Sequence, residues 1–335
     1  MPESSKPPCR TTTIDRHIEA ASLEQEMRTE IRRALQSTPK ALTPKWLYDE
    51  RGSQIFDEIT RLDEYYPTEA ERSILTHHAG EIAAHSAATT IIELGSGTSD
   101  KTRTLLDAFD STGQLERFVP FDVSEAPINE ATEMLAMRYP SVHLHAVVGD
   151  FHRHLNEIPS TGHRLLAFLG STIGNFHVEE RAAFLGALGD LLDEGEWLLL
   201  GMDLVKDVGR IIDAYNDPSG VSEAFARNVL TVLNREFDGD IPVEQFDYIP
   251  FWDPTEQRID IRLRAAMPLE ARLDSLDLDI SFGEGEELRV EVSTKFTRGR
   301  IDHELSEAGF AVDRFWTTAG PDGSADYGLV LARRA

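Results

Sequence analysis

Glycines and acidic residues at three successive predicted strand ends form the pattern that could carry chemistry. The string IIELGSGT runs from an apolar strand into a turn, and Gly95 and Gly97 let the backbone approach a ligand where a Cβ would collide. Asp122 ends the strand RFVPFDV and can bind both hydroxyls of a ribose. Asp150 ends LHAVVGD, where it can accept a hydrogen bond from an adenine amino group while Phe151 contacts the ring. Because ligands of open α/β sheets bind at the carboxyl ends of the strands, these residues predict a nucleoside site.

Each of these features has a simpler explanation when it is taken alone. A structural turn accounts for a lone G-x-G, and a helix N-cap accounts for an aspartate after a strand. The third glycine of a dinucleotide fingerprint is replaced by Asp100, which disfavours an oxidoreductase. The phosphate loop G-x-x-x-x-G-K-[ST] does not occur, which disfavours phosphoryl transfer. With no pyrophosphate to bind, the adenosyl sulfonium S-adenosylmethionine is the natural candidate.

The elements that must position these groups follow from the hydrophobic pattern. Near-continuous apolar strands alternate with helical patterns of about 10–15 residues, which indicates a parallel sheet covered on both faces. These strands are expected at 91–94, 117–123, 144–150, 165–172 and 197–204. Two further strands, AVDRFWTT and DYGLVLARR, flank a PDGS turn near the C-terminus. A hairpin added to a parallel sheet resembles the methyltransferases that use S-adenosylmethionine, whose seventh strand is antiparallel, so we expect an α/β fold with a seven-stranded Rossmann-like sheet.

A change in the hydrophobic pattern after the last parallel strand predicts a second domain. Segments such as QRIDIRLRAAM and ELRVEVSTKFTR alternate with period two, which is typical of an antiparallel sheet with one solvated face. We therefore predict a disordered tail at 1–14, a methyltransferase core at 71–204 plus 296–335, and a mixed α+β substrate-binding domain at 15–70 plus 205–295.

Composition narrows the classes of partner. The 335 residues carry a formal charge of −26, which disfavours nucleic acid and anionic membrane surfaces. Six lysines stand against 27 arginines and 59 acidic residues, a balance that fits either adaptation to high salt or an ordinary acidic surface. Cys9 is the only cysteine, so neither an intrachain disulfide nor a thiol-based metal site is expected, and we predict no metal. Without a signal-peptide pattern or a membrane-spanning run, a cytoplasmic monomer is the simplest expectation.

Several longer strings point to one family. The string KWLYDERGSQIFDEITRLDEYYPTEAE at 45–71 resembles the N-terminal signature of the histidine Nα-methyltransferases of ergothioneine biosynthesis. The strings ELGSGTSDKT, FDVS, GDF, FLGSTIGNF and EVSTKF are similar to the same family in the same order. The resemblance covers nearly the whole chain after the tail, and several of these strings are specific to the family rather than common to methyltransferases.

The resemblance also implies site residues. S-adenosylmethionine would be bound by Gly95, Gly97, Lys101, Asp122, Asp150 and Phe151. The substrate L-histidine would be bound by Tyr48, Tyr65, Gly170, Asn175, Tyr215, Glu291, Val292 and Ser293, with Tyr48, Tyr65 and Asn175 as the catalytic residues. One departure is Ile261, where the family often has a methionine beside the imidazole, and this affects side-chain packing rather than the class of substrate.

These residue types also suit methyl transfer to an amine. The protein must align the amine nitrogen with the methyl group and keep the amine neutral, and amide and hydroxyl oxygens do this better than carboxylates would. Asn175 and Tyr215 therefore suit the α-carboxylate and amine of a substrate. Glu291 and Ser293 stand two apart on a predicted strand, so both side chains can contact one imidazole. The aromatic rings of Tyr48, Tyr65 or Phe176 could accommodate the growing methylammonium. Without the resemblance, Glu291 would be interpreted as a solvated strand residue.

The predicted reaction converts L-histidine to Nα,Nα,Nα-trimethylhistidine (hercynine) in three transfers that release three S-adenosylhomocysteines. The main alternative is a related enzyme that methylates another amino acid or an indole amine such as a tryptophan derivative. An alternative of another class is a catalytically idle cofactor-binding partner in a biosynthetic complex, which would be expected to lack Asn175 and the tyrosines of the substrate site.

Overall fold

A computed structural model describes residues 12–18, 20–97, 99 and 101–335 of the chain. Residues 1–11 of the predicted tail, which include Cys9, lie outside the described residues, and so does Asp100. None of the helices in these residues combines the length and the hydropathy of a membrane-spanning segment.

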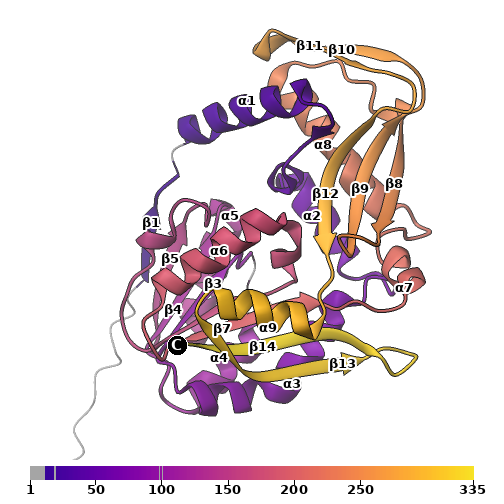
Figure 1. The fold of residues 1–335 in the computed structure, drawn as a ribbon. Coiled ribbons are helices and arrows are strands. Elements are labelled where there is room, and N and C mark those ends of the chain that lie inside the picture. Colours follow the sequence, from indigo (N-terminus) through magenta and orange to yellow (C-terminus); the bar gives the residue numbers. More distant parts are fainter. Residues whose placement is uncertain (1–11, 19, 98, 100) are drawn as a thin grey trace, which may run out of the picture.

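The larger part of the molecule is an α/β layer structure built on one mostly parallel sheet (Figure 1). The strands lie in the order β1-β5-β4-β3-β6-β7-β14-β13. Their bounds are β1 Thr12–Arg16, β3 Thr90–Leu94, β4 Arg117–Asp122, β5 His143–Val148, β6 Arg164–Phe168, β7 Trp197–Asp203, β13 Phe310–Ala319 and β14 Ala325–Arg334. Strand β14 pairs antiparallel with both β7 and β13, which confirms the predicted C-terminal hairpin. This is the α/β class that was expected.

The sheet has eight strands rather than seven, because the N-terminal segment adds one. Residues Thr12–Arg16 form β1, which pairs parallel with β5 along its whole length. The prediction of disorder to residue 14 is therefore wrong for residues 12–14. Their Thr-rich sequence forms ladder hydrogen bonds to an edge strand, and Nε2 of His145 lies at hydrogen-bond distance, 2.6 Å, from Oδ2 of Asp15.

Helices cover both faces of this sheet. They are α3 Pro67–Ser86, α4 Thr102–Ser111, α5 Glu125–Arg138, α6 Val178–Leu191 and α9 Arg298–Glu307. Neighbouring residues of one strand enter different cores: Ile91 packs in the core on one face and Ile92 in the core on the other, both fully buried. Burial on both faces is why these strands are continuously apolar in sequence.

A second region has its own apolar core and a mainly antiparallel four-stranded sheet in the order β2-β12-β9-β8. These strands are β2 Lys40–Ala41, β8 Phe246–Asp253, β9 Arg258–Ala265 and β12 Glu287–Thr294, and β10 Leu269–Leu273 pairs with β11 Leu278–Phe282 as a separate hairpin. The helices are α1 Ala20–Gln36, α2 Glu50–Ile59, α7 Val208–Asp213 and α8 Val221–Phe237. Short 3₁₀ turns lie at Pro44–Leu47, Leu155–Glu157, Thr172–Asn175, Val243–Gln245 and Asp274–Leu276.

An irregularity in β12 decides which way its polar side chains point. Arg289 pairs with Arg262 but Glu291 pairs with Ile261, so a β-bulge at Val290 shifts the register. After the bulge, Glu291 lies on the same face as Ile261, which belongs to the apolar core of this region. Bulges are common beside active sites because they redirect side chains in this way.

The two regions are joined at several places. A β-bridge pairs Leu204 with Phe296 just after β7 and β12, and α1 continues from β1 of the large sheet to the second region (Figure 1). The predicted domain boundary at residue 71 falls inside α3, which is continuous from Pro67. Residues 67–70 therefore belong with the large sheet, because Pro67 begins the helix that packs on it.

Candidate active site

The glycine turn after β3 and the aspartate after β4 lie side by side. Gly97 adopts a φ of +47°, a conformation that a residue with a Cβ rarely adopts, and its N–H donates to Oδ2 of Asp122 at 2.9 Å. The Oδ1 atom of Asp122 accepts from the N–H of Ser124 at 2.9 Å. Burial raises the pKa of the Asp122 carboxyl, although these backbone donors oppose the rise. Asp122 thus supports the turn directly and remains partly exposed beside it.

The residues after β5 form the neighbouring part of this edge. Asp150 is partly exposed, and its Oδ1 accepts from the N–H of His152 at 2.8 Å. The ring of Phe151 packs edge-on against Phe168 and Phe184, with centroids 5.7 and 5.6 Å away. The polar group and the aromatic ring of the predicted adenine contact therefore stand next to each other at the end of a strand.

A buried glutamate connects the predicted cofactor residues to the predicted substrate residues. Glu71 of α3 is fully buried and forms an ion pair with Lys101. The same carboxylate accepts from the N–H of Gly170 at 2.8 Å and from the hydroxyl of Tyr327 at 2.7 Å. Lys101, predicted to bind the cofactor, is thereby fixed beside Gly170, predicted to line the substrate site.

Asn175 contacts the strand that carries Glu291. Its Nδ2 donates to Oε1 of Glu291 at 2.9 Å and to the backbone carbonyl of Val292 at 2.8 Å. The 3₁₀ turn that carries Asn175 approaches β12 closely, since a Cβ on Gly174 would lie 2.7 Å from the carbonyl oxygen of Thr294. With both amide protons used, the Oδ1 atom of Asn175 is left as an acceptor. A neutral acceptor suits an amine that must lose its proton.

Tyr215 and Ser293 form a second contact to β12. Their hydroxyl oxygens are 2.8 Å apart, and Lys295 donates to both, at 2.8 Å to Tyr215 and 2.9 Å to Ser293. Lys295 also forms an ion pair with Oδ2 of Asp203 at 2.8 Å. Burial favours a higher pKa for Asp203, but the charges of Lys295 and Lys206 outweigh it and hold the pKa of this carboxyl below its usual value.

The tyrosines predicted to contact the substrate lie around these two contacts. The rings of Tyr65 and Tyr215 meet edge-on with centroids 6.0 Å apart, and Tyr48 packs edge-on against Phe56 and Phe225. Burial, followed by nearby negative charges such as that of Glu291, raises the pKa of all three tyrosine hydroxyls well above 10. They therefore stay protonated at neutral pH and act as neutral hydrogen-bonding groups.

Glu291 differs from an ordinary surface glutamate. Burial raises the pKa of its carboxyl to about 7, and the hydrogen bond from Asn175 and the charge of Lys295 limit the rise. Ile261 lies directly opposite it across β9 and β12 and is buried. A carboxylate between an amide and an apolar side chain suits a flat, polar ring such as an imidazole.

Three supporting residues were not predicted: Glu71, Asp203 and Lys295. Two of them carried a signal in the sequence. Asp203 ends a predicted parallel strand, as Asp122 and Asp150 do, and Lys295 continues the alternation of Glu291 and Ser293. Glu71 lies within a helix, and no sequence pattern marks it as a buried ion-pair partner.

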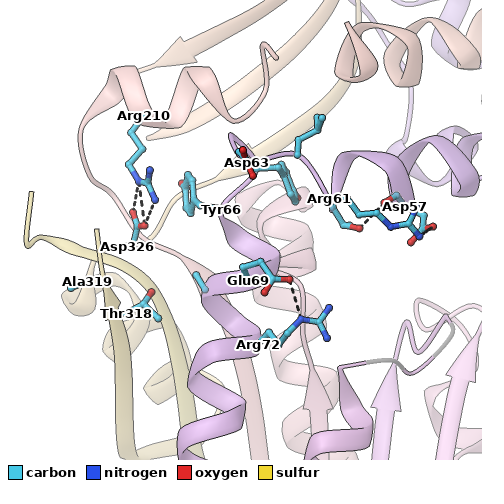
Figure 2. Close-up of a pocket in the computed structure, with 14 residues that line it drawn as sticks. Asp57, Arg61, Asp63, Tyr66, Glu69, Arg72, Arg210, Thr318, Ala319 and Asp326 are labelled. Carbon is cyan, nitrogen blue, oxygen red and sulfur yellow. Dashed lines mark hydrogen bonds and ion pairs between the residues drawn. The ribbon is translucent and has the colours of Figure 1, made fainter. Parts of the chain in front are cut away.

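A cavity of about 610 Å³ adjoins this site (Figure 2). Of the predicted site residues it is lined only by Tyr65, and Tyr66 stands beside it in the wall. The ion pair between Arg210 and Asp326, with nitrogen and oxygen 2.9 Å apart, crosses one side of the cavity. The cavity therefore flanks the predicted substrate site rather than containing it.

The arrangement fits a nucleoside-bearing methyl donor. The predicted residues lie at the carboxyl ends of β3, β4 and β5, and most keep partial exposure, as residues that line a ligand site must. Among the described residues, the Oγ atom of Ser96 is buried in the glycine turn without a hydrogen-bond partner, which leaves a polar group for a ligand. The fold is that of a Rossmann-like methyltransferase, and the predicted cofactor residues lie where such a fold binds its ligand.

Comparison with known proteins identifies the family. Residues 27–334 match the family model described as "Histidine-specific methyltransferase, SAM-dependent", and the chain belongs to this family. It is 46% identical over 324 residues to the Histidine N-alpha-methyltransferase of Mycolicibacterium smegmatis, which covers 97% of this chain and 100% of the relative.

Two more distant relatives are fungal. Ergothioneine biosynthesis protein 1 of Neurospora crassa is 30% identical over 325 residues, and the match covers 95% of this chain but 36% of that longer protein. The 4-dimethylallyltryptophan N-methyltransferase easF of Claviceps fusiformis is 27% identical over 345 residues, covering 94% of each chain.

Proposed function

We propose that this protein transfers three methyl groups from S-adenosylmethionine to the α-amino nitrogen of L-histidine, giving hercynine, a step of ergothioneine biosynthesis. The observation that carries the proposal is the contact of Asn175 with Glu291 and Val292, which joins the predicted amine-binding group to the predicted imidazole-binding group. Full-length similarity to a named histidine N-alpha-methyltransferase supports it.

The chemistry needs little acid–base assistance from the protein. The bound cofactor supplies an electrophilic methyl group, and Gly95, Gly97, Lys101, Asp122, Asp150 and Phe151 would hold it. Before each of the three transfers the substrate nitrogen must lose a proton, so its neighbours must not stabilise the ammonium form. The Oδ1 atom of Asn175 and the protonated hydroxyls of Tyr48 and Tyr65 meet this condition, whereas a carboxylate at this position would oppose it.

Specificity for histidine would come from Glu291 and Ser293. The carboxylate can accept a hydrogen bond from one imidazole N–H. A site of this kind lowers kcat/KM by about 10⁴-fold or more for an analogue that leaves its polar groups unpaired. The alternative, methylation of an indole amine, finds some support in the relative that acts on dimethylallyltryptophan. An indole offers one ring N–H and no ring acceptor, so it satisfies this pair of groups less well.

Mass spectrometry of products tests the proposal. Purified protein with S-adenosylmethionine and L-histidine should give products that carry one, two and three methyl groups on the α-nitrogen, ending in the trimethylated form. Tryptophan and tyrosine, incubated in parallel, should remain unmodified. Methylation of tryptophan alone would favour the indole alternative, and binding of cofactor without any product would favour the idle partner. The cytoplasmic location and the monomeric state remain predictions from the sequence.

A further inference from the structure

Lys295 occupies an unusual position for a lysine. It is fully buried, one of only six lysines in the chain, and follows β12 directly. Its backbone N–H donates to the carbonyl of Gln257 at 2.7 Å, which continues the pairing of β12 with β9. The alternation of side chains therefore places Lys295 on the same face as Glu291 and Ser293, next to the substrate site.

All three protons of this ammonium group have acceptors. They are Oδ2 of Asp203 at 2.8 Å, the hydroxyl oxygen of Tyr215 at 2.8 Å and Oγ of Ser293 at 2.9 Å. An ammonium group only donates, so each hydroxyl oxygen receives a hydrogen bond from Lys295. The 2.8 Å contact between the two hydroxyls uses the proton of one of them. The proton of the other hydroxyl remains to donate to a ligand.

The charge of Lys295 favours an anion beside the two hydroxyls, because the neighbouring cations are engaged elsewhere. Asp203 is shared between Lys295 and Lys206, while the next carboxylate, Asp326, lies 3.6 Å from Lys206 and is also paired with Arg210. Of these three cations only Lys295 donates to the hydroxyls of Tyr215 and Ser293, and because it is fully buried its charge is screened less than a surface charge would be.

We propose that Lys295 is a positioning residue for the amino-acid substrate. Its ammonium group fixes the hydroxyls of Tyr215 and Ser293 in one mutual orientation and strengthens the one remaining hydroxyl proton as a donor to histidine. Lys295 does not touch the substrate; it acts through these two side chains. The inference rests on the proposed histidine site and adds the residue that couples its carboxylate-binding side to its ring-binding side.

The test compares Lys295→Met with Lys206→Met as a matched control. Both lysines are buried and paired with Asp203, but only Lys295 donates to Tyr215 and Ser293. Because Lys295→Met removes a charged hydrogen-bond donor, we expect it to raise the KM for histidine about tenfold to a hundredfold. The dissociation constant for S-adenosylmethionine should change less than threefold. Lys206→Met should destabilise the protein to a similar extent but leave the KM for histidine within threefold of the wild type.

A second measurement separates positioning from general damage. Calorimetry should show that wild-type protein binds histidine more tightly than histamine, which lacks the carboxylate, and that Lys295→Met loses most of this preference. If circular dichroism shows that the methionine variant does not fold, Lys295→Gln, which keeps a donor but not the charge, should show the same loss.

The inference is overturned if a folded Lys295 variant keeps the wild-type KM and the wild-type preference for histidine, or if Lys206→Met raises the KM equally. These outcomes differ from a failure of the proposed function, in which the wild-type protein itself would form no methylated histidine.

Discussion

The residues predicted to bind the cofactor (the cofactor side: Gly95, Gly97, Lys101, Asp122, Asp150 and Phe151) and those predicted to bind the substrate (the substrate side, with Asn175, Tyr215 and Glu291) are supported in different ways. On the cofactor side, polar groups follow directly after strands β3, β4 and β5 and contact near neighbours in sequence, such as Gly97 with Asp122, 25 residues apart. On the substrate side, Asn175 and Glu291 are 116 residues apart, and the groups come from both regions of the molecule. The cofactor side depends on strand ends that any sheet of this order brings together, while the substrate side depends on docking of the second region.

The two sides also differ in the kind of groups they use. Backbone N–H groups and partly exposed carboxylates dominate the cofactor side, whereas the substrate side contains a buried network in which Asp203, Lys295, Ser293 and Tyr215 all have partners. A buried polar network is costly when one member is removed, because the others are left unpaired. We therefore expect substrate-side substitutions to have larger and more coupled effects than cofactor-side ones.

The largest effect is expected from Asn175→Asp. This isosteric change removes the two N–H donors to Glu291 and Val292 and places a second carboxylate against Glu291. The kcat/KM for histidine should fall about a hundredfold or more, since a buried acceptor without its donor costs about 1–3 kcal/mol and a like charge adds to this. Steady-state kinetics and cofactor titration check the prediction. A dissociation constant for S-adenosylmethionine that rises as much as the kinetic loss would contradict the separation of the two sides.

On the cofactor side, Asp122→Ala should weaken S-adenosylmethionine binding about tenfold to a hundredfold. The variant loses the acceptor for the N–H of Gly97 and the predicted acceptor for the ribose hydroxyls, and hydrogen bonds to a charged group contribute about 1.5–3 kcal/mol. Calorimetry with S-adenosylhomocysteine measures the affinity directly. Histidine affinity, measured separately, should change less than threefold, and an equal loss for both ligands would show that the two sides are not independent.

The raised pKa of Glu291 predicts how stability depends on pH. Because its pKa is about 7 in the folded protein and about 4.5 when unfolded, its favourable contribution is complete below about 4.5 and is lost as pH rises to about 7. When the pH rises from 5 to 8, Glu291→Gln should therefore gain on the order of 2 kcal/mol of stability relative to the wild type. This figure is smaller than the full pKa shift would give, because the carboxyl keeps some solvent contact. Urea unfolding at both pH values tests this. A difference between variant and wild type that does not change with pH would mean that Glu291 titrates normally.

The smallest effect is expected from Phe151→Leu. Leucine keeps the apolar packing against Phe168 and Phe184 but loses the flat ring predicted to contact adenine. Aromatic contacts of this kind contribute about 0.5–1.5 kcal/mol, so the dissociation constant for S-adenosylmethionine should rise about two- to tenfold. The KM for histidine at saturating cofactor should stay the same. A change in the KM of histidine alone would place Phe151 on the substrate side.

Much of the large sheet could be predicted from sequence because its strands are buried on both faces. A nearly continuous apolar run such as IIEL or WLLLGMD, bounded by turn residues, indicates a strand buried on both faces, and the polar residue at its end marks the edge where ligands bind. Strand β1 was missed for the opposite reason: it is short, polar and at an edge, so its hydrogen bonds to β5 leave little trace in hydrophobic periodicity.

By itself, the sequence determined the parallel strands β3 to β7 and the helices between them, the polar residues at the strand ends and the resemblance to a methyltransferase family. The tertiary structure alone decided where Glu291 points. In ELRVEVST, simple alternation would place Glu291 with Glu287 and Arg289 on the outer face, and the bulge at Val290 turns it inward. Only the tertiary structure shows that Asp203 and Lys295 meet, 92 positions apart, because burying a charge is favourable only when a partner from elsewhere in the chain is already in place.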